Sequence, residues 1–189
     1  DCEQVSNELK NIKLVKKIIE VNNNKYKNPI AELFTPVINS LVENYTHIMA
    51  PASTFGKNIM PRLAAILDVS QVSDIIKVES PDTFIRPIYA GNALATVQST
   101  DSKKIITVRA TSFEPALSEG GNAEIEKLEF NSEINITEFI NREENKSDRP
   151  ELGTARVVIS GGRGLGSQEN FALLNDIADK LNAAVGASR

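Results

Sequence analysis

The sequence predicts an α/β protein with a three-layer, mostly parallel sheet, an antiparallel extension of that sheet, and a terminal βαβ unit. Three observations support this class. Helix-like and strand-like apolar patterns alternate over residues 2–67. From Ser73 onward, short β-rich runs separated by turn residues replace that alternation. The last segment, from Val157, joins an apolar run, a glycine-rich turn and an amphipathic helix.

The first part of the chain contains three predicted helices and two predicted strands. Apolar residues at helical spacing predict a short helix over 2–12, and the apolar run 14–21 predicts a strand. An amphipathic helix is expected over 29–44, with a kink at Pro36. A short buried strand at 46–49 and a further helix at 59–67, with Leu63 on its buried side, complete this part.

The middle of the chain reads as a series of short strands. They are expected at 74–78, 83–89, 93–98 and 104–109, and turn residues separate them. Hairpins that follow a βα series indicate an antiparallel extension of a mostly parallel sheet. Arg86 and Arg109 are unusual in such strands. Either they are charges facing solvent on a half-exposed sheet, or they form a pair that faces another subunit.

A charged segment separates this part from the end of the chain. Residues 118–145 carry many acidic side chains and few apolar ones, which fit at most one edge strand. We therefore predict a first α/β domain over residues 1–145. The second domain is predicted to begin at residue 146 and to run to residue 189.

Composition excludes several classes of function. The net charge of −4 argues against a nucleic-acid binder that relies on neutralising phosphates. A single cysteine, Cys2, and a single histidine, His47, exclude a disulfide framework and a multi-histidine metal site. No apolar run approaches the roughly 20 residues that cross a bilayer, so no direct membrane insertion is expected. No targeting signal is visible.

The residues also offer no catalytic constellation. No nucleophile, base and orienting group can be assembled, so we expect no catalytic residues, and cofactor binding in place of independent catalysis. His47 lies at a predicted strand start, where a hydrogen-bonded, buried histidine is the expected role and a catalytic one the alternative.

The glycine-rich turn is the strongest functional signal. Four glycines lie within positions 161–166, after the strand 157–160 and before a helix for which Ser167 is the expected N-cap. A strand, Ala184–Ala187, closes the unit. This arrangement aims backbone N–H groups at a phosphate. The dinucleotide pattern is incomplete, since Ser167 replaces its third glycine and its acidic residue is missing, so a structural turn is the alternative.

A second candidate lies between the strand at 46–49 and the helix at 59–67. Ser53, Thr54, Gly56 and Lys57 resemble a phosphate cradle, although the P-loop spacing cannot be written here. The alternative is ordinary turn chemistry with a helix cap.

Several long segments resemble the alpha subunits of electron transfer flavoproteins. They are SGGRG with the helix that follows, ADKLNAAVGASR, YTHIMAPASTFGKNIMPRLAA, SDIIKVESPDTFIRPIYAGNALATV, VRATSFEPA and KSDRPEL. The resemblance covers nearly the whole chain and implies that the chain is a fragment. It implies a nucleotide-binding-like first domain that lacks its first strand and helix. It also implies a second domain that is the start of a Rossmann-like FAD-binding domain.

The resemblance also implies a function, which is an electron carrier and not an enzyme. Such subunits pair with a beta subunit, hold one FAD, and carry electrons from acyl-CoA dehydrogenases to a membrane quinone oxidoreductase. Arg163, Ser188 and Arg189 match FAD-contacting positions. Arg163 is expected beside the diphosphate, and Arg189 on the isoalloxazine ring, where it would favour the reduced, anionic form. The implied location is the mitochondrial matrix, or the cytoplasm of a bacterium.

Two other functions remain open at this point. The chain could belong to a pyridine-nucleotide-dependent dehydrogenase in which Ser188 and Arg189 bind the 2′-phosphate of NADP. It could also be a cofactor-free domain that only makes subunit contacts. Nothing in the sequence identifies the dehydrogenases that would dock.

Overall fold

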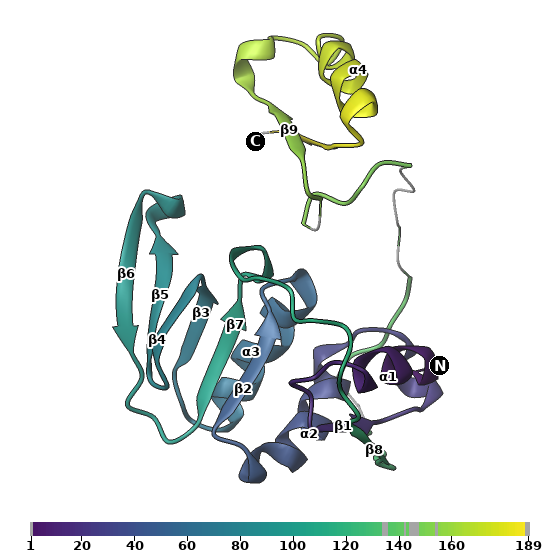
Figure 1. Cartoon of the computed structure of the whole chain (residues 1–189), viewed down its shortest axis with the longest axis vertical. Helices are drawn as coiled ribbons and strands as arrows, with labels where there is room; N and C mark the ends of the chain where they lie inside the picture. The colour runs from purple at the N-terminus through teal and green to yellow at the C-terminus, as the bar shows by residue number, and fades with distance from the viewer. Residues whose placement is uncertain (1, 134–135, 142, 144–147, 154, 188–189) are drawn as a thin grey trace. The chain divides into compact units, whose positions relative to one another are not determined.

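The computed structural model describes residues 2–133, 136–141, 143, 148–153 and 155–187. Contacts within the chain divide it into two units, residues 1–139 and 140–189, which are described separately (Figure 1). The mixture of helices with parallel and antiparallel strands confirms the predicted α/β class.

The first unit contains three α-helices, four short 3-10 helices and eight strands among its described residues. The helices are α1 (Glu3–Lys10), α2 (Ala31–Leu41), α3 (Thr54–Ile66), η1 (Asn24–Lys27), η2 (Val42–Asn44), η3 (Tyr89–Gly91) and η4 (Ala110–Ser112). The strands are β1 (Lys17–Glu20), β2 (His47–Pro51), β3 (Gln71–Ile75), β4 (Lys77–Ser80), β5 (Thr83–Ile88), β6 (Ala93–Gln98), β7 (Lys104–Val108) and β8 (Glu124–Lys127).

A parallel sheet in the order β2-β7-β3 forms the centre of the first unit (Figure 1). Neighbouring residues of the central strand β7 point to opposite faces. Ile105 packs with Met60 and Leu63 of α3 on one face. Ile106 packs with Phe84 of β5 on the other face. The sheet therefore lies between a helical layer and the antiparallel sheet β4-β5-β6, which gives the predicted three layers.

The predicted strand at 74–78 is wrong, because the chain changes partners within it. Strand β3 runs parallel to β7 and ends at Ile75, whereas β4 begins at Lys77 and runs antiparallel to β5. Asp74 has a left-handed backbone conformation with φ of 58°. Its N–H donates to the side-chain hydroxyl of Thr107 on β7 at 2.8 Å and not to a backbone carbonyl of that strand. The pairing shifts register at this irregularity, and the chain then enters the antiparallel sheet.

The helices around the central sheet begin and end differently from the prediction. Helix α3 begins at Thr54, five residues before the predicted start, because the Ser53 hydroxyl caps it by accepting the N–H of Gly56 at 3.2 Å. Helix α2 includes Pro36 and ends at Leu41, and the 3-10 turn η2 follows it.

Strand β8 confirms the edge strand predicted within the acidic segment. It pairs parallel with β1, and Lys17 lies opposite Glu124. Helix α1 is joined to β1 by a buried hydrogen bond in which the Ser6 hydroxyl donates to Glu20 at 2.7 Å. The predicted elements at 2–12 and 14–21 are therefore present as α1 and the shorter β1.

The second unit is a βαβ arrangement (Figure 1). Strands β9 (Val158–Gly161) and β10 (Ala184–Ala187) pair in parallel, and helix α4 (Phe171–Leu181) connects them after the 3-10 turn η5 (Arg163–Leu165). The predicted N-cap at Ser167 is wrong. The helix begins at Phe171, because Ser167 still belongs to the glycine turn and its N–H donates to the Leu165 carbonyl at 2.8 Å.

Candidate functional site

An open pocket of about 410 Å³ lies at the glycine turn of the second unit. It is lined by residues that end β9, form η5, precede α4 and end β10. These are Gly161, Gly162, Arg163, Leu165, Gly166, Ser167, Gln168, Phe171 and Ala187. The pocket thus lies at the carboxyl ends of two parallel strands, which is where ligands bind in open α/β sheets.

Close packing explains the first glycine of the turn. A Cβ atom at Gly161 would lie 2.2 Å from a methyl carbon of Leu165 and 2.6 Å from one of Leu174. A larger residue at this position would therefore force these two leucine side chains to move. Gly166 serves a different purpose, since its φ of 74° is a conformation that side chains disfavour.

The first two N–H groups of helix α4 are paired within the chain. The N–H groups of Phe171 and Ala172 at the start of α4 donate to the carbonyls of Gln168 and Glu169, both at 3.1 Å. The prediction that the helix N-terminus presents its N–H groups to an anion is therefore wrong for these two residues. The first N–H groups of a 3-10 turn have no acceptor inside the turn, so those of η5 are suited to a phosphate.

Arg163, one of the three predicted cofactor-binding residues, lines this pocket. Its side chain is exposed and lines the pocket beside Gly162 and Ser167. Its five N–H donors and fixed positive charge suit a phosphate or diphosphate. Ser188 and Arg189, the other predicted site residues, lie outside the described residues. Ala187, which immediately precedes them, lines the same pocket.

An arginine that the sequence analysis did not single out fixes helix α4. Arg149 donates through Nε to Asp179 at 2.8 Å and through a terminal nitrogen to Asn175 at 2.7 Å. It therefore attaches the segment that enters the unit to the helix behind the pocket. Asn175 and Asp179 are four residues apart and so lie on one face of the helix, and this spacing is the sequence signal for a shared partner.

The second sequence candidate, between β2 and α3, behaves as turn chemistry. The Ser53 hydroxyl caps α3, and a Cβ atom at Gly56 would lie 2.0 Å from the Pro51 carbonyl oxygen. Gly56 is thus required by the close approach of the helix to β2, and its surroundings are filled by the backbone of the chain. The helix cap explains Ser53, and the close approach of the backbone explains Gly56, without a bound phosphate.

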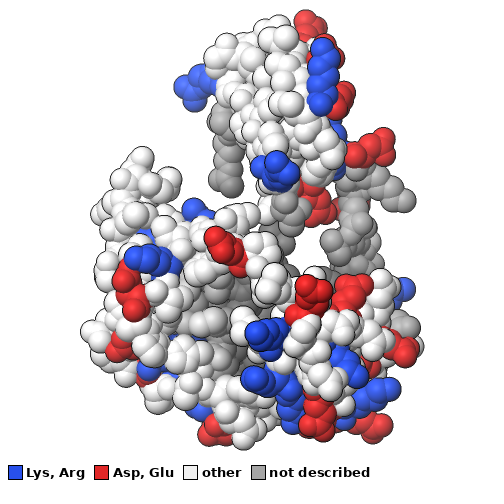
Figure 2. All heavy atoms as spheres, viewed as in Figure 1, with Lys and Arg blue, Asp and Glu red and all other residues white. Residues whose placement is uncertain are grey.

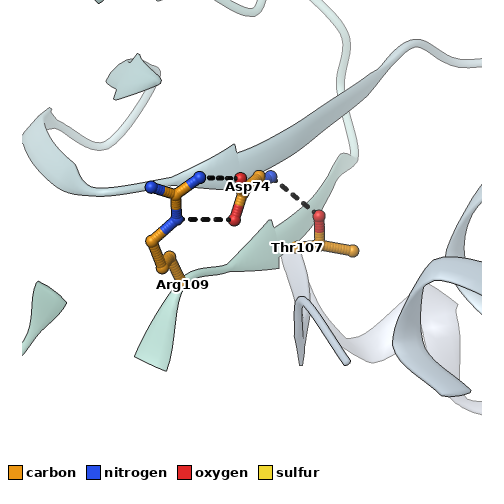
Figure 3. Close-up of polar contacts among 3 residues, drawn as sticks. All are labelled: Asp74, Thr107 and Arg109. Carbon is orange, nitrogen blue, oxygen red and sulfur yellow. Dashed lines mark hydrogen bonds and ion pairs between the residues drawn. The ribbon is translucent and has the colours of Figure 1, made fainter. Parts of the chain in front are cut away.

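An ion pair between Asp74 and Arg109 lies at the carboxyl ends of the parallel strands β3 and β7 (Figure 3). Arg109, just after β7, donates through Nε to Asp74 at 3.1 Å and forms a second, shorter contact through a terminal nitrogen. The hydrogen bond and the charge of Asp74 raise the pKa of Arg109. The pair holds the left-handed Asp74 in place between β3 and β7.

Arg86 differs from the prediction of a solvent-facing charge. It lies two residues after the fully buried Phe84 on β5, so both side chains point to the inner face of the antiparallel sheet. Its Nε atom is buried and has no hydrogen-bond partner among the residues that the structure describes. Arg109, in contrast, is 44% exposed, as expected of a partly solvent-facing side chain.

His47 is hydrogen-bonded through both ring nitrogens, to Thr46 and to the Pro81 carbonyl, and is half-buried. It fits the structural role that the sequence favoured, at lower burial than expected.

Within the part of the chain that the structure describes, no group of three or more histidine, cysteine or acidic residues could hold a metal ion. No described helix is long and apolar enough to cross a membrane. Basic and acidic side chains are interspersed on the face drawn in Figure 2.

Comparison with known proteins decides the family. Residues 4–133 match the family model described as the electron transfer flavoprotein domain, which covers most of the chain. The chain belongs to the electron transfer flavoprotein family. Residues 151–189, which contain the glycine-turn pocket, match the model described as the electron transfer flavoprotein FAD-binding domain. The predicted resemblance is confirmed.

Relatives in bacteria and eukaryotes support the same assignment. The chain is 51% identical over 93% of its length to the electron transfer flavoprotein subunit alpha of Pseudomonas aeruginosa. It is 45% identical over its whole length to the mitochondrial subunit alpha of Dictyostelium discoideum. In each case it covers 57% of the relative. The chain therefore spans a little over half the length of these curated relatives.

Proposed function

We propose that this chain is part of the alpha subunit of a heterodimeric electron carrier that holds FAD. The observation that supports this best is the glycine-turn pocket, which lies within the residues matched by the FAD-binding domain model. The partner is a beta subunit, the electron donors are acyl-CoA dehydrogenases, and the acceptor is a membrane quinone oxidoreductase. The protein is a carrier and not an enzyme.

The residues of the pocket fit a dinucleotide cofactor. The turn η5 offers backbone N–H groups, and Arg163 offers a positive charge beside them, which together suit the diphosphate. Ser188 and Arg189 follow directly on Ala187 and would extend this site toward the flavin. When bound, FAD supplies the redox chemistry, and this chain binds and orients it.

The location and the domain boundary are also proposals. Relatives from Dictyostelium discoideum and Caenorhabditis elegans are named as mitochondrial, which favours the mitochondrial matrix for a eukaryotic protein and the cytoplasm for a bacterial one. The two family models leave residues 134–150 unmatched between them. We place the boundary between the N-terminal domain and the FAD-binding domain in this segment, close to residue 145.

A visible absorption spectrum of the full-length subunit, purified with its beta partner, tests the proposal. We expect flavin absorption in the blue that is bleached by a reductant. Absorbance only in the ultraviolet, with NADP released on denaturation, would favour the dehydrogenase alternative. A stable pair of chains with neither cofactor would favour a domain that only makes subunit contacts.

A further inference from the structure

A pocket of about 250 Å³ in the first unit is separate from the glycine turn. It lies where the start of β3 meets the inner face of β5 and β6 and the loop that follows β6. Arg86, Ser99 and Asp101 contribute its functional side chains, and Gln71 and Gln98 add amide groups. Val72 and Val97 form its apolar part, next to the core around Phe84.

Two polar atoms at this pocket have no partner. The Nε atom of Arg86 and the Oγ atom of Ser99 are both buried and without a hydrogen bond among the described residues. Ser99 as a whole is only 7% exposed. Buried donors are almost always paired in folded proteins, and an unpaired one costs about 1–3 kcal/mol. Both atoms belong to residues that line one cavity, so a molecule bound there is in a position to pair with them.

The charge of Arg86 identifies the kind of ligand. A half-buried guanidinium normally lies against a carboxylate, but no ion pair to Arg86 is present in the described part of the chain. The carboxylate of Asp101 lines the same pocket, yet its Oδ2 accepts the backbone N–H of Ser70 at 2.9 Å. An oxyanion suits these side chains, because it accepts hydrogen bonds from a guanidinium and from a hydroxyl and carries the charge opposite to that of Arg86.

We propose that the pocket of Arg86 and Ser99 binds a small oxyanion, either a carboxylate or a phosphate group. Arg86 supplies the charge and two or more donors, and the Ser99 hydroxyl supplies one further donor. The negative charge of Asp101 repels an anion and therefore lowers the affinity of the pocket for it. This site lies in a different unit from the proposed FAD site and does not depend on it.

An NMR titration of the isotopically labelled chain tests the proposal. The Nε–Hε cross-peak of Arg86 is identified by its loss in Arg86→Lys. Inorganic phosphate and sodium acetate are then added separately, with sodium chloride keeping the ionic strength constant. We expect a saturable shift of this cross-peak with at least one of the two anions. A response to phosphate only identifies a phosphate site, and a response to acetate identifies a carboxylate site.

Variants show whether the pocket is responsible. Because Arg86→Ala has no Nε–Hε signal, anion binding is measured in all variants from the shift of the Ser99 backbone amide. Arg86→Ala should weaken binding by about tenfold or more, because the charge-assisted hydrogen bonds are lost. Asp101→Asn should tighten it several-fold while it keeps the acceptor for Ser70. Lys77→Ala removes an exposed charge from the same sheet and should change nothing. The proposal is wrong if wild type shows no saturable shift with either anion, or if Lys77→Ala weakens binding as much as Arg86→Ala.

Discussion

At the scale of single residues, burial separates structural positions from functional ones. Leu63 on α3 is fully buried against Ile105, as its helical spacing predicts. Arg163 is exposed in the glycine turn, where a ligand can reach it. Arg86 breaks this division, because it is a charge on the inner face of a sheet. Strand periodicity did not reveal this, since the sequence does not state which face of the strand is covered.

Leu63→Ala should destabilise the protein strongly. Removing a fully buried leucine side chain leaves a cavity, so the free energy of unfolding should fall by about 2–5 kcal/mol. The matched control is Leu94→Ala, because Leu94 lies on β6 and is 64% exposed. The control should change the stability by less than about 0.5 kcal/mol. Chemical denaturation of both variants measures the difference, and equal losses would refute the role of Leu63 in the core.

Arg189 gives a prediction about redox potential in the full-length protein with its partner. Arg189→Ala should leave folding nearly intact and lower the flavin midpoint potential, because a positive charge beside the ring favours the anionic reduced form. A charge a few ångströms away is worth at most about 4 kcal/mol at an effective dielectric constant near 20. Arg189→Lys should restore part of the potential, since it keeps the charge and loses the planar surface. Equal midpoints by potentiometric titration in all three proteins would mean that Arg189 does not contact the flavin.

At the scale of elements, patterns predicted the existence of helices and strands better than their ends. The ends depend on single contacts that a pattern does not contain. Ser53 caps α3 five residues before the predicted start, and the glycine turn delays α4 until Phe171. The segment 74–78 looked like one continuous strand because Ile75, Ile76 and Val78 are strong β-formers. It is divided because the N–H of Asp74 donates to Thr107, a contact between segments far apart in sequence.

The hairpin of β4 and β5 should become less stable in acid. Asp82 between these strands accepts hydrogen bonds from Ser80 at 2.6 Å, Gln98 at 2.7 Å and Thr83 at 2.8 Å, and these lower its pKa in the folded state. Because the folded pKa is below the unfolded value of about 3.9, the stabilisation is present above that pH and is lost as the pH falls further.

The variant Asp82→Asn tests this pH dependence. Wild type should melt at a higher temperature than the variant near neutral pH. The difference should shrink as the pH falls below about 4, because the unfolded wild-type chain then binds a proton at Asp82 that the folded chain, with its lower pKa, does not bind. Thermal melts over a pH series measure it. A difference that stays constant down to the lowest accessible pH would show that Asp82 does not stabilise the hairpin through its charge.

At the scale of the whole molecule, the two units differ in how their residues are packed. In the first unit, clusters of buried residues lie on both faces of the central sheet, whereas the second unit presents a single βαβ arrangement with an open pocket. So open a pocket would leave most of the surface of a bound dinucleotide in water.

It follows that the 189-residue chain alone should bind FAD weakly or not at all. A pocket that leaves most of the cofactor in water cannot recover the loss of freedom on binding. Titration of the isolated chain, followed by FAD fluorescence, measures the affinity. Tight, stoichiometric flavin in the purified chain would show that these residues form the site unaided.

The most direct test of the central claim, that the glycine turn holds the cofactor, is FAD affinity in the full-length alpha and beta pair. Arg163→Ala should leave the melting temperature of the apoprotein unchanged and raise the dissociation constant by about tenfold or more, since a hydrogen bond to a charged group is worth about 1.5–3 kcal/mol. Lys180→Ala is the control in the same unit, because it removes an exposed positive charge at the end of α4 that does not line the pocket. It should keep wild-type affinity. Unchanged FAD affinity in Arg163→Ala would contradict the assignment of this pocket.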